Sequence, residues 1–219
     1  MLDTLDIETA AAPDAAIIWL HGLGADAHDF ESVVPQIVRP GERAWRFVFP
    51  NAPIRPVTLN GGMQMRAWYD LKSLDRSAAE DLPGFWDTDA RIRELIGRES
   101  TRGVAANRVV LGGFSQGGAA SLYTALRYPE RIAGVLALSC YLPLQDRLPT
   151  ERSVQNGATP IFMAHGRADA VLSMSLGVES CDTLRKLAYP VEWHDYAMAH
   201  AVCAAEIADI RAFLLRVLA

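Results

Sequence analysis

Short apolar runs alternate along the chain with longer segments in which apolar residues recur at the spacing of an α-helix. The apolar runs, which predict β-strands, are Ile17–Leu20, Phe47–Phe49, Val109–Leu111, Gly134–Leu138, Ile161–Ala164 and Val191–Trp193. The segments with helical spacing are Asp29–Val38, Asp87–Glu99, Gly117–Arg127, Ser175–Leu187 and Cys203–Val217. This alternation predicts an α/β fold, in which a mainly parallel central sheet is flanked by helices.

Two segments break the alternation. The first, from about Pro50 to Pro83, is too long for an ordinary connection, and we expect it to be functional or partly structured. The second, from Tyr141 to Pro160, is too short to form a separate helical cap domain. We therefore expect residues 1–219 to form a single domain in which loops alone cover any active site.

The charged and apolar residues limit the kinds of partner. The chain has 21 Lys plus Arg against 26 Asp plus Glu, a net charge of −5, and its basic residues are scattered. A surface that follows nucleic-acid phosphates needs clustered positive charge, so we expect no nucleic-acid partner. The longest apolar runs are far shorter than the roughly 20 residues that a membrane span needs, so we expect no integral membrane segment.

The cysteines and the N-terminal residues indicate the cellular compartment of the protein. Cys140, Cys181 and Cys203 are widely spaced without a C-x-x-C pair, which argues against both a zinc site and a disulfide framework. The segment Met1–Asp6 is acidic, whereas a secretory signal begins with basic residues. We therefore expect a cytoplasmic protein without a metal.

The segment from Val109 to Gly118 carries the strongest chemical signal. A predicted strand leads into the G-x-S-x-G pattern around Ser115, and a predicted helix follows. This context is typical of a nucleophile elbow, in which a tight turn lifts the serine Oγ above the sheet edge. Gly113 and Gly117 stand where a Cβ would obstruct the turn. The alternative is a glycine-rich turn with an incidental serine.

A second glycine turn follows the first predicted strand. Gly22–Ala27 reads G-x-G-x-x-A, which also fits a dinucleotide-binding turn and hence an NAD(P)-dependent oxidoreductase. That fingerprint needs an acidic residue at the end of the second strand, and Pro50 and Asn51 stand there instead. An oxyanion loop explains the glycines better, with the backbone N–H groups of Leu23 and Gln116 as donors.

A serine nucleophile in this fold needs an acid and then a histidine later in the chain. His200 lies in the loop between the last strand and the last helix, where it can reach the sheet edge. His194 lies within the last strand, and we expect it to be structural or solvated. Asp169 follows the strand Ile161–Ala164 and is the candidate acid, whereas His165 is expected to support that turn.

Three motifs, taken together, resemble the carboxylesterase/acyl-protein thioesterase family of α/β-hydrolases, of the phospholipase/carboxylesterase type. They are His21–Asp26, Gly113–Gly118 and Met198–Cys203. The resemblance covers nearly the whole chain and implies that Ser115 is the nucleophile, Asp169 the acid and His200 the base. It also implies that Leu23 and Gln116 are the oxyanion donors, that no cofactor is needed, and that the substrate is a small acyl ester or thioester.

The resemblance implies a serine carboxylesterase for short to medium acyl esters, with an acyl-protein thioesterase or a lysophospholipase as the alternative. The sequence departs from the family pattern at two places. Asp169 is followed by Ala170 rather than by proline, and Tyr141 stands where thioesterases often carry tryptophan. A non-catalytic binding protein and the oxidoreductase are the remaining alternatives, and the sequence is compatible with a homodimer.

Apolar residues of the irregular segments are candidates for an acyl-binding groove. The five candidates are Met63, Trp68, Tyr141, Val171 and Leu172. Trp68 and Val171 also fit an ordinary place in the core. A groove closed by loops is shallow, so we expect catalytic efficiency to rise with acyl length and to level off between about four and ten carbons.

Overall fold

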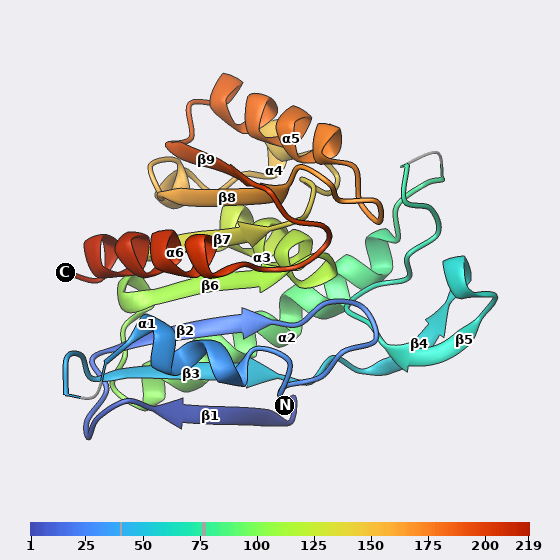
Figure 1. Ribbon diagram of the computed structural model, residues 1–219. Helices are drawn as coiled ribbons and strands as arrows, with labels where there is room; N and C mark the ends of the chain where they lie inside the picture. Colours follow the sequence, from blue (N-terminus) through green and yellow to red (C-terminus); the bar gives the residue numbers. More distant parts are fainter. Residues whose placement is uncertain (40, 76–77) are drawn as a thin grey trace.

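A twisted, mostly parallel sheet forms the centre of the computed structural model (Figure 1), which describes residues 1–39, 41–75 and 78–219. In this part of the chain, seven strands pair in the order β1-β3-β2-β6-β7-β8-β9. Their bounds are β1 (Thr4–Glu8), β2 (Ala15–Leu20), β3 (Trp45–Pro50), β6 (Val109–Phe114), β7 (Gly134–Leu138), β8 (Ile161–Gly166) and β9 (Val191–Tyr196). β1 runs antiparallel to β3, and each of the other pairs is parallel.

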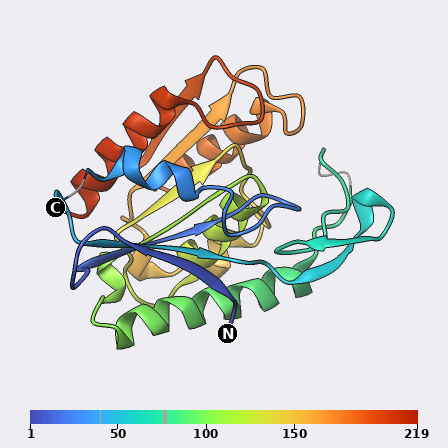
Figure 2. The same ribbon diagram turned by 60° about the horizontal axis from the view of Figure 1, so that its bottom comes forward.

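Helices cover both faces of the sheet (Figure 2). The α-helices are α1 (Val34–Ile37), α2 (Leu82–Thr101), α3 (Gln116–Arg127), α4 (Leu148–Glu151), α5 (Met174–Lys186) and α6 (Ala204–Val217). Single 3₁₀ turns are η1 (Glu31–Val33), η2 (Thr58–Asn60), η3 (Ala106–Arg108) and η4 (Val154–Asn156). α1 and α6 pack on one face, whereas α2, α3 and α5 pack on the other.

Strand β2 shows how the sequence produces this layered core. All of its residues are buried, and its side chains alternate between the two faces because a strand has a period of two. Ile17 and Trp19 pack in the core beneath α1 and α6, whereas Ile18 and Leu20 pack beneath α2 and α3. A strand buried on both faces has no polar positions, which accounts for its continuous apolar sequence.

The structure confirms the predicted α/β fold, but it shortens one predicted helix. In place of Asp29–Val38 it has η1 followed by the single turn α1. The side chain of Asp26 accepts a hydrogen bond from the N–H of His28 at 2.9 Å, and the N–H of Asp29 donates to the carbonyl of Asp26 at 3.2 Å. These local bonds satisfy the backbone in a turn conformation that competes with a helix.

The long irregular segment contains a two-stranded hairpin of β4 (Ile54–Val57) and β5 (Met63–Arg66), which projects beyond the sheet in Figure 1. Periodicity did not reveal this hairpin, because its strands are short and β4 contains Pro56. Proline is tolerated there because a two-stranded ribbon has an unpaired edge on each strand. The hairpin and the neighbouring loops border the cavity described below.

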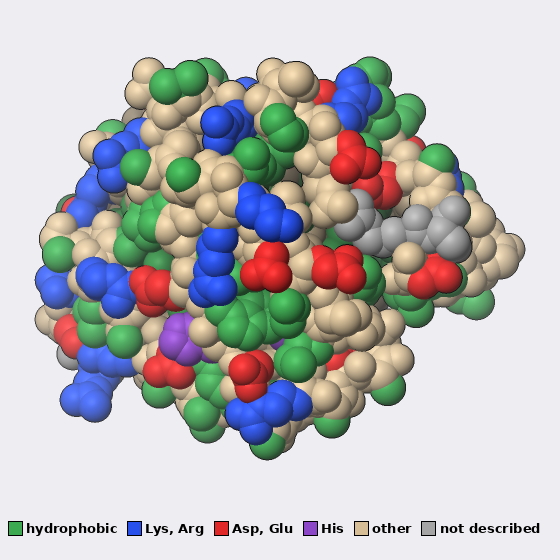
Figure 3. Space-filling model, turned by 90° about the horizontal axis from the view of Figure 1, so that it is seen from above, with side chains coloured by type: hydrophobic (Ala, Val, Ile, Leu, Met, Phe, Trp, Pro, Cys, Tyr) green, Lys and Arg blue, Asp and Glu red, His purple; other side chains and the backbone are tan. Residues whose placement is uncertain are grey.

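The surface carries mixed charge, and no helix of the described residues is both long and apolar enough to cross a bilayer. On the face shown in Figure 3, basic and acidic side chains are interspersed with apolar ones. Ion pairs between elements contribute to this mixture, such as Arg216 with Glu192 and Arg167 with Asp195. Pairing of this kind leaves little net potential on the surface that carries it.

Glu206 is an acidic residue buried in the first turn of α6, with none of its surface exposed. Neither of its carboxylate oxygens has a well-formed hydrogen bond within the described residues. Burial raises the pKa of Glu206 to about 8, and the backbone N–H of Cys203 offsets this shift only in part. The folded protein therefore holds a proton that the unfolded chain releases near pH 4.5.

Glu206→Gln removes this linked proton, so we expect its stability relative to the wild type to increase as the pH rises. The difference in the free energy of unfolding should grow by a few kcal/mol between about pH 5 and pH 8 and then level off, and the difference in melting temperature should follow it. Thermal unfolding at a series of pH values measures this difference. The exposed Glu130→Gln is the control, and a Glu206→Gln difference that is constant with pH would contradict the assignment.

Candidate active site

The turn between β6 and α3 places Ser115 above the edge of the sheet. Ser115 has φ 54° and ψ −118°, a left-handed conformation that costs energy for a residue other than glycine. A Cβ on Gly113 would lie 2.5 Å from the carbonyl carbon of Gly117 and 2.7 Å from the carbonyl oxygen of Leu20. A larger residue at Gly113 would therefore force the turn open, which explains the glycines on both sides of Ser115.

The loop after β2 orients a peptide group toward the same place. The ring of His21 accepts a hydrogen bond at Nε2 from the N–H of Ala52 at 3.1 Å, so its Nδ1 carries the proton and donates to the carbonyl of Gly22 at 2.7 Å. Burial lowers the pKa of His21 and thereby favours this neutral form. Because C=O and N–H point in opposite directions in a trans peptide, this bond turns the N–H of Leu23 away from the His21 ring.

Contacts from the end of β5 and from the segment after it hold this loop from the other side. The N–H of Gly24 donates to the carbonyl of Arg66 at 2.9 Å, and Nε1 of Trp68 donates to the carbonyl of His21 at 2.9 Å. Trp68 is fully buried by this arrangement. The hairpin segment thus supports the loop rather than lying free over it.

Gln116 connects the elbow to the same segment. Its side-chain oxygen accepts a hydrogen bond from the N–H of Trp68, and its side-chain nitrogen donates to the carbonyl of Tyr69, each at 2.8 Å. The backbone N–H of Gln116 is in the first turn of α3, where no intrahelical acceptor is available. Within residues 1–39, 41–75 and 78–219, no protein acceptor pairs with the N–H of Gln116 or of Leu23.

Asp169 and His200 form a hydrogen-bonded pair at the ends of β8 and β9. Nδ1 of His200 lies 2.7 Å from Oδ2 of Asp169, whose side chain is completely buried. The other oxygen, Oδ1, accepts hydrogen bonds from the N–H groups of Val171 and Leu172 at 2.9 Å each. These bonds fix the orientation of the carboxylate, so the Nε2 atom of His200 remains available on the far side of the ring.

Two neighbouring rings hold this pair in place. The ring of Phe114 packs against that of His200, with 4.7 Å between their centroids. Nε2 of His165 lies 2.9 Å from the carbonyl oxygen of Leu172 and 3.3 Å from Oδ2 of Asp169. Burial lowers the pKa of His165, so this ring is neutral and uses its Nε2–H as a donor to the acid turn.

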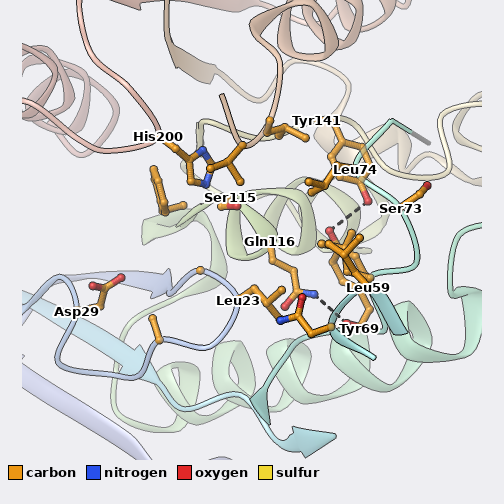
Figure 4. Close-up of a pocket in the computed structure, with 17 residues that line it drawn as sticks. Leu23, Asp29, Leu59, Tyr69, Ser73, Leu74, Ser115, Gln116, Tyr141 and His200 are labelled. Atoms are coloured by element: carbon orange, nitrogen blue, oxygen red, sulfur yellow. Dashed lines mark hydrogen bonds between the residues drawn. The ribbon is translucent and has the colours of Figure 1, made fainter. Parts of the chain in front are cut away.

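These groups open into one cavity of about 330 Å³, which Figure 4 shows in close-up. Ser115 and His200 both face it, and Leu23 and Gln116 lie at its edge (Figure 4). Its remaining lining is mainly apolar and comes from Gly22, Ala25, Asp29, Leu59, Asn60, Tyr69, Leu71, Ser73, Leu74, Phe114, Tyr141, Val171 and Leu172. The hydroxyls of Tyr69 and Tyr141 lie 3.2 Å apart in a hydrogen bond.

Three of the five predicted groove residues line this cavity, and two do not. Tyr141, Val171 and Leu172 are in the lining, whereas Met63 and Trp68 are outside it. The expectation for Met63 is corrected because it lies on β5 with most of its surface in solvent. The expectation for Trp68 is corrected because its indole is buried behind the His21 loop, as its alternative reading as a core residue anticipated.

The sequence prediction missed three leucines of the lining, Leu59, Leu71 and Leu74. They belong to the irregular segment, in which the apolar pair Leu71 and Leu74 was the available signal. His194 lies elsewhere, on β9, with its ring stacked on that of Phe162 at 4.6 Å. Among the described residues, no cluster of His, Cys, Asp or Glu is arranged to hold a metal ion.

Comparisons with known proteins identify the family of the chain. The family model described as Phospholipase/Carboxylesterase matches residues 4–218. A protein named acyl-protein thioesterase 1 from Mycosarcoma maydis is 40% identical, over 100% of this chain and 98% of its own length. A protein of the same name from Yarrowia lipolytica is 39% identical, over 93% of this chain and 92% of its own length.

Solved structures show the same fold. The crystal structure of Zea mays acyl-protein thioesterase 2 superimposes with a TM-score of 0.89 and 26% identity, covering 100% of both chains. That of Arabidopsis thaliana SOBER1 gives a TM-score of 0.86 and 28% identity, over 94% of this chain and 99% of its own.

The geometry around His165 predicts a positioning role that can be measured. His165→Phe keeps a buried ring and removes only the Nε2–H donor, because Nδ1 has no partner among the described residues. We expect kcat for an acyl ester to fall about tenfold with KM within twofold, since the bond orients Asp169 rather than substrate. His194→Phe is the matched control. Equal kcat for the two variants would contradict this role.

Proposed function

The chain belongs to the phospholipase/carboxylesterase family, and from this membership we propose that it is a serine hydrolase that cleaves short to medium acyl esters through an acyl-enzyme. One observation carries the proposal: His200, hydrogen-bonded to the buried Asp169, faces the same apolar cavity as the strained Ser115. This geometry supports the proposed roles of Ser115 as nucleophile, His200 as base and Asp169 as its orienting acid, with the cavity as a place for the acyl chain.

In the proposed first step, Ser115 Oγ attacks the carbonyl carbon of the substrate while Nε2 of His200 takes its proton. Asp169, which two backbone N–H groups orient through its second oxygen, stabilises the positively charged imidazole. The developing oxyanion accepts hydrogen bonds from the N–H groups of Leu23 and Gln116. The dipole of α3, whose first residue is Gln116, adds to this stabilisation.

The tetrahedral intermediate then collapses, and His200 donates its proton to the departing alcohol or thiol. The acyl group is now an ester of Ser115. Water enters at the same position and loses a proton to His200 as it attacks the acyl carbon. A second collapse returns the proton to Ser115 and releases the carboxylic acid, so no cofactor is consumed.

The second candidate is an acyl thioester substrate, which the names of the relatives favour. The same steps apply to a thioester, since only the leaving atom changes. The oxidoreductase alternative loses support, because the N–H of Gly24 and the carbonyl of Gly22 are already bonded within the protein. The cytoplasmic location also remains a proposal, supported by three cysteines that form no disulfide.

Substitution of the proposed triad tests the mechanism. We expect Ser115→Ala and His200→Ala each to remove nearly all hydrolysis of p-nitrophenyl butyrate, because the two groups act as a unit. A fluorophosphonate probe should label the wild type at Ser115, as located by peptide mass spectrometry. His194→Ala is the matched control and should keep most activity. Labelling at another serine, or equal loss in both histidine variants, would refute the assignment.

Acyl-length dependence tests the cavity. Each buried methylene contributes about 0.8 kcal/mol, so kcat/KM should rise along a series of linear esters and level off between about four and ten carbons. Leu172→Ala should lower kcat/KM for the octanoyl ester about tenfold more than for the acetyl ester. Val178→Ala, at an exposed position of α5, is the control. An equal effect on both lengths would exclude Leu172 from the acyl site.

A further inference from the structure

A second cavity meets the first at the candidate histidine. It measures about 410 Å³, and the two cavities share Asp29, Phe114 and His200. The rest of its lining comes from the segment around η1 and from the residues after His200, namely Phe30, Ser32, Val33, Gln36, Ala201, Val202 and Ile207. His200 therefore stands between an apolar cavity and a more polar one.

The chemistry of acyl transfer assigns different parts of a substrate to the two cavities. This step rests on the proposed function. The acyl chain fits the first cavity, whose lining includes Leu59, Leu71 and Leu172. The leaving oxygen or sulfur must lie next to Nε2 of His200, because that atom returns the proton to it. The remainder of the alcohol or thiol then extends into the second cavity, on the other side of His200.

The second cavity has the properties of a site for positive charge. Asp29 makes no side-chain hydrogen bond or ion pair to any described residue, and neither Lys nor Arg is among the residues that line the cavity. The rings of Phe30 and Phe114 stand beside it, with centroids 5.8 Å apart. A carboxylate without a counter-ion and the faces of aromatic rings both attract a cation, quaternary ammonium groups above all.

The charged groups around Asp29 also leave its carboxylate available to a ligand. Partial burial, and then the nearby Asp26, raise the pKa of Asp29, and no basic group is among the causes that act on it. The next acidic residue, Glu31, is already paired with His28 at 2.9 Å. Arg211, a basic residue of α6, is bound to Glu42 and to the carbonyl of Ile37. Asp29 is thus the carboxylate that remains open to a ligand here.

We propose that the second cavity is the leaving-group subsite, and that Asp29 gives it a preference for alcohols or thiols that carry a positive charge a few bonds from the scissile atom. Asp29 acts here as a specificity-determining residue, because it binds the departing part of the substrate and takes no part in the proton transfers. The preference therefore appears in the comparison of leaving groups rather than in the rate with a neutral ester.

Two esters of equal shape test this assignment. Butyrylcholine and 3,3-dimethylbutyl butyrate have the same acyl chain, and their leaving groups differ in a quaternary nitrogen or carbon. In the wild type we expect kcat/KM to be about fivefold to tenfold higher for the choline ester. Asp29→Asn should abolish most of this ratio, chiefly by lowering kcat/KM for the choline ester. Glu31→Gln, two residues away and outside the second cavity, should keep the ratio.

Two further measurements strengthen the test. Gln36→Lys places a cation in the same cavity, so it should lower the ratio as Asp29→Asn does. Raising the salt from about 0.05 M to about 0.5 M should lower the ratio of the wild type and leave that of Asp29→Asn unchanged, because salt screens an exposed charge.

The outcomes separate the two proposals. If the wild type hydrolyses the neutral ester but Asp29→Asn leaves the ratio of kcat/KM for the two esters unchanged, the subsite proposal is overturned and the proposed function stands. Equal loss on both esters in Asp29→Asn also overturns it, since the residue would then act on the scaffold. If the wild type hydrolyses neither ester and no fluorophosphonate labels Ser115, the proposed function fails and the subsite fails with it.

Discussion

The close approach between the end of β2 and the first turn of α3 is the constraint on which the site depends. Gly113 and Gly117 have no side chains, so the carbonyl of Leu20 can lie against the start of the helix. This contact brings two backbone N–H groups, those of Leu23 and Gln116, from distant parts of the sequence to one edge of the cavity. It also forces Ser115 into its left-handed conformation, so the strain of the turn and the placement of the donors have one cause.

Polar contacts from the hairpin segment hold the end of β2 and the first turn of α3 in this close contact. The Gln116 amide binds the backbone at Trp68 and Tyr69, and the Trp68 indole binds the carbonyl of His21. Both contacts are buried, where an unpaired polar group is costly, so the segment cannot shift without losing several bonds at once. The protein thus uses buried side chains to hold the backbone of the segments that border the cavity.

How far the sequence could predict this site depends on what positions each residue. Ser115, Asp169 and His200 follow strands, and parallel strands deliver their ends to one edge, so short-range pattern was enough to find these candidates. The loops could not be predicted in this way. Trp68 is directed inward by a bond to His21, a residue 47 positions away, and no local periodicity encodes such a contact. The cavity leucines share this difficulty, because their direction depends on how the hairpin packs.

The way the structure holds Asp169 has a consequence for how such a site can diversify. Its carboxylate is bound by the main-chain N–H groups of Val171 and Leu172, whereas the side chains of the same two residues line the cavity. Main-chain donors are present whichever residue other than proline occupies these positions. Mutational drift at the two positions can therefore reshape the pocket while the acid stays anchored. The fold in this way separates the evolution of substrate range from the maintenance of catalytic chemistry.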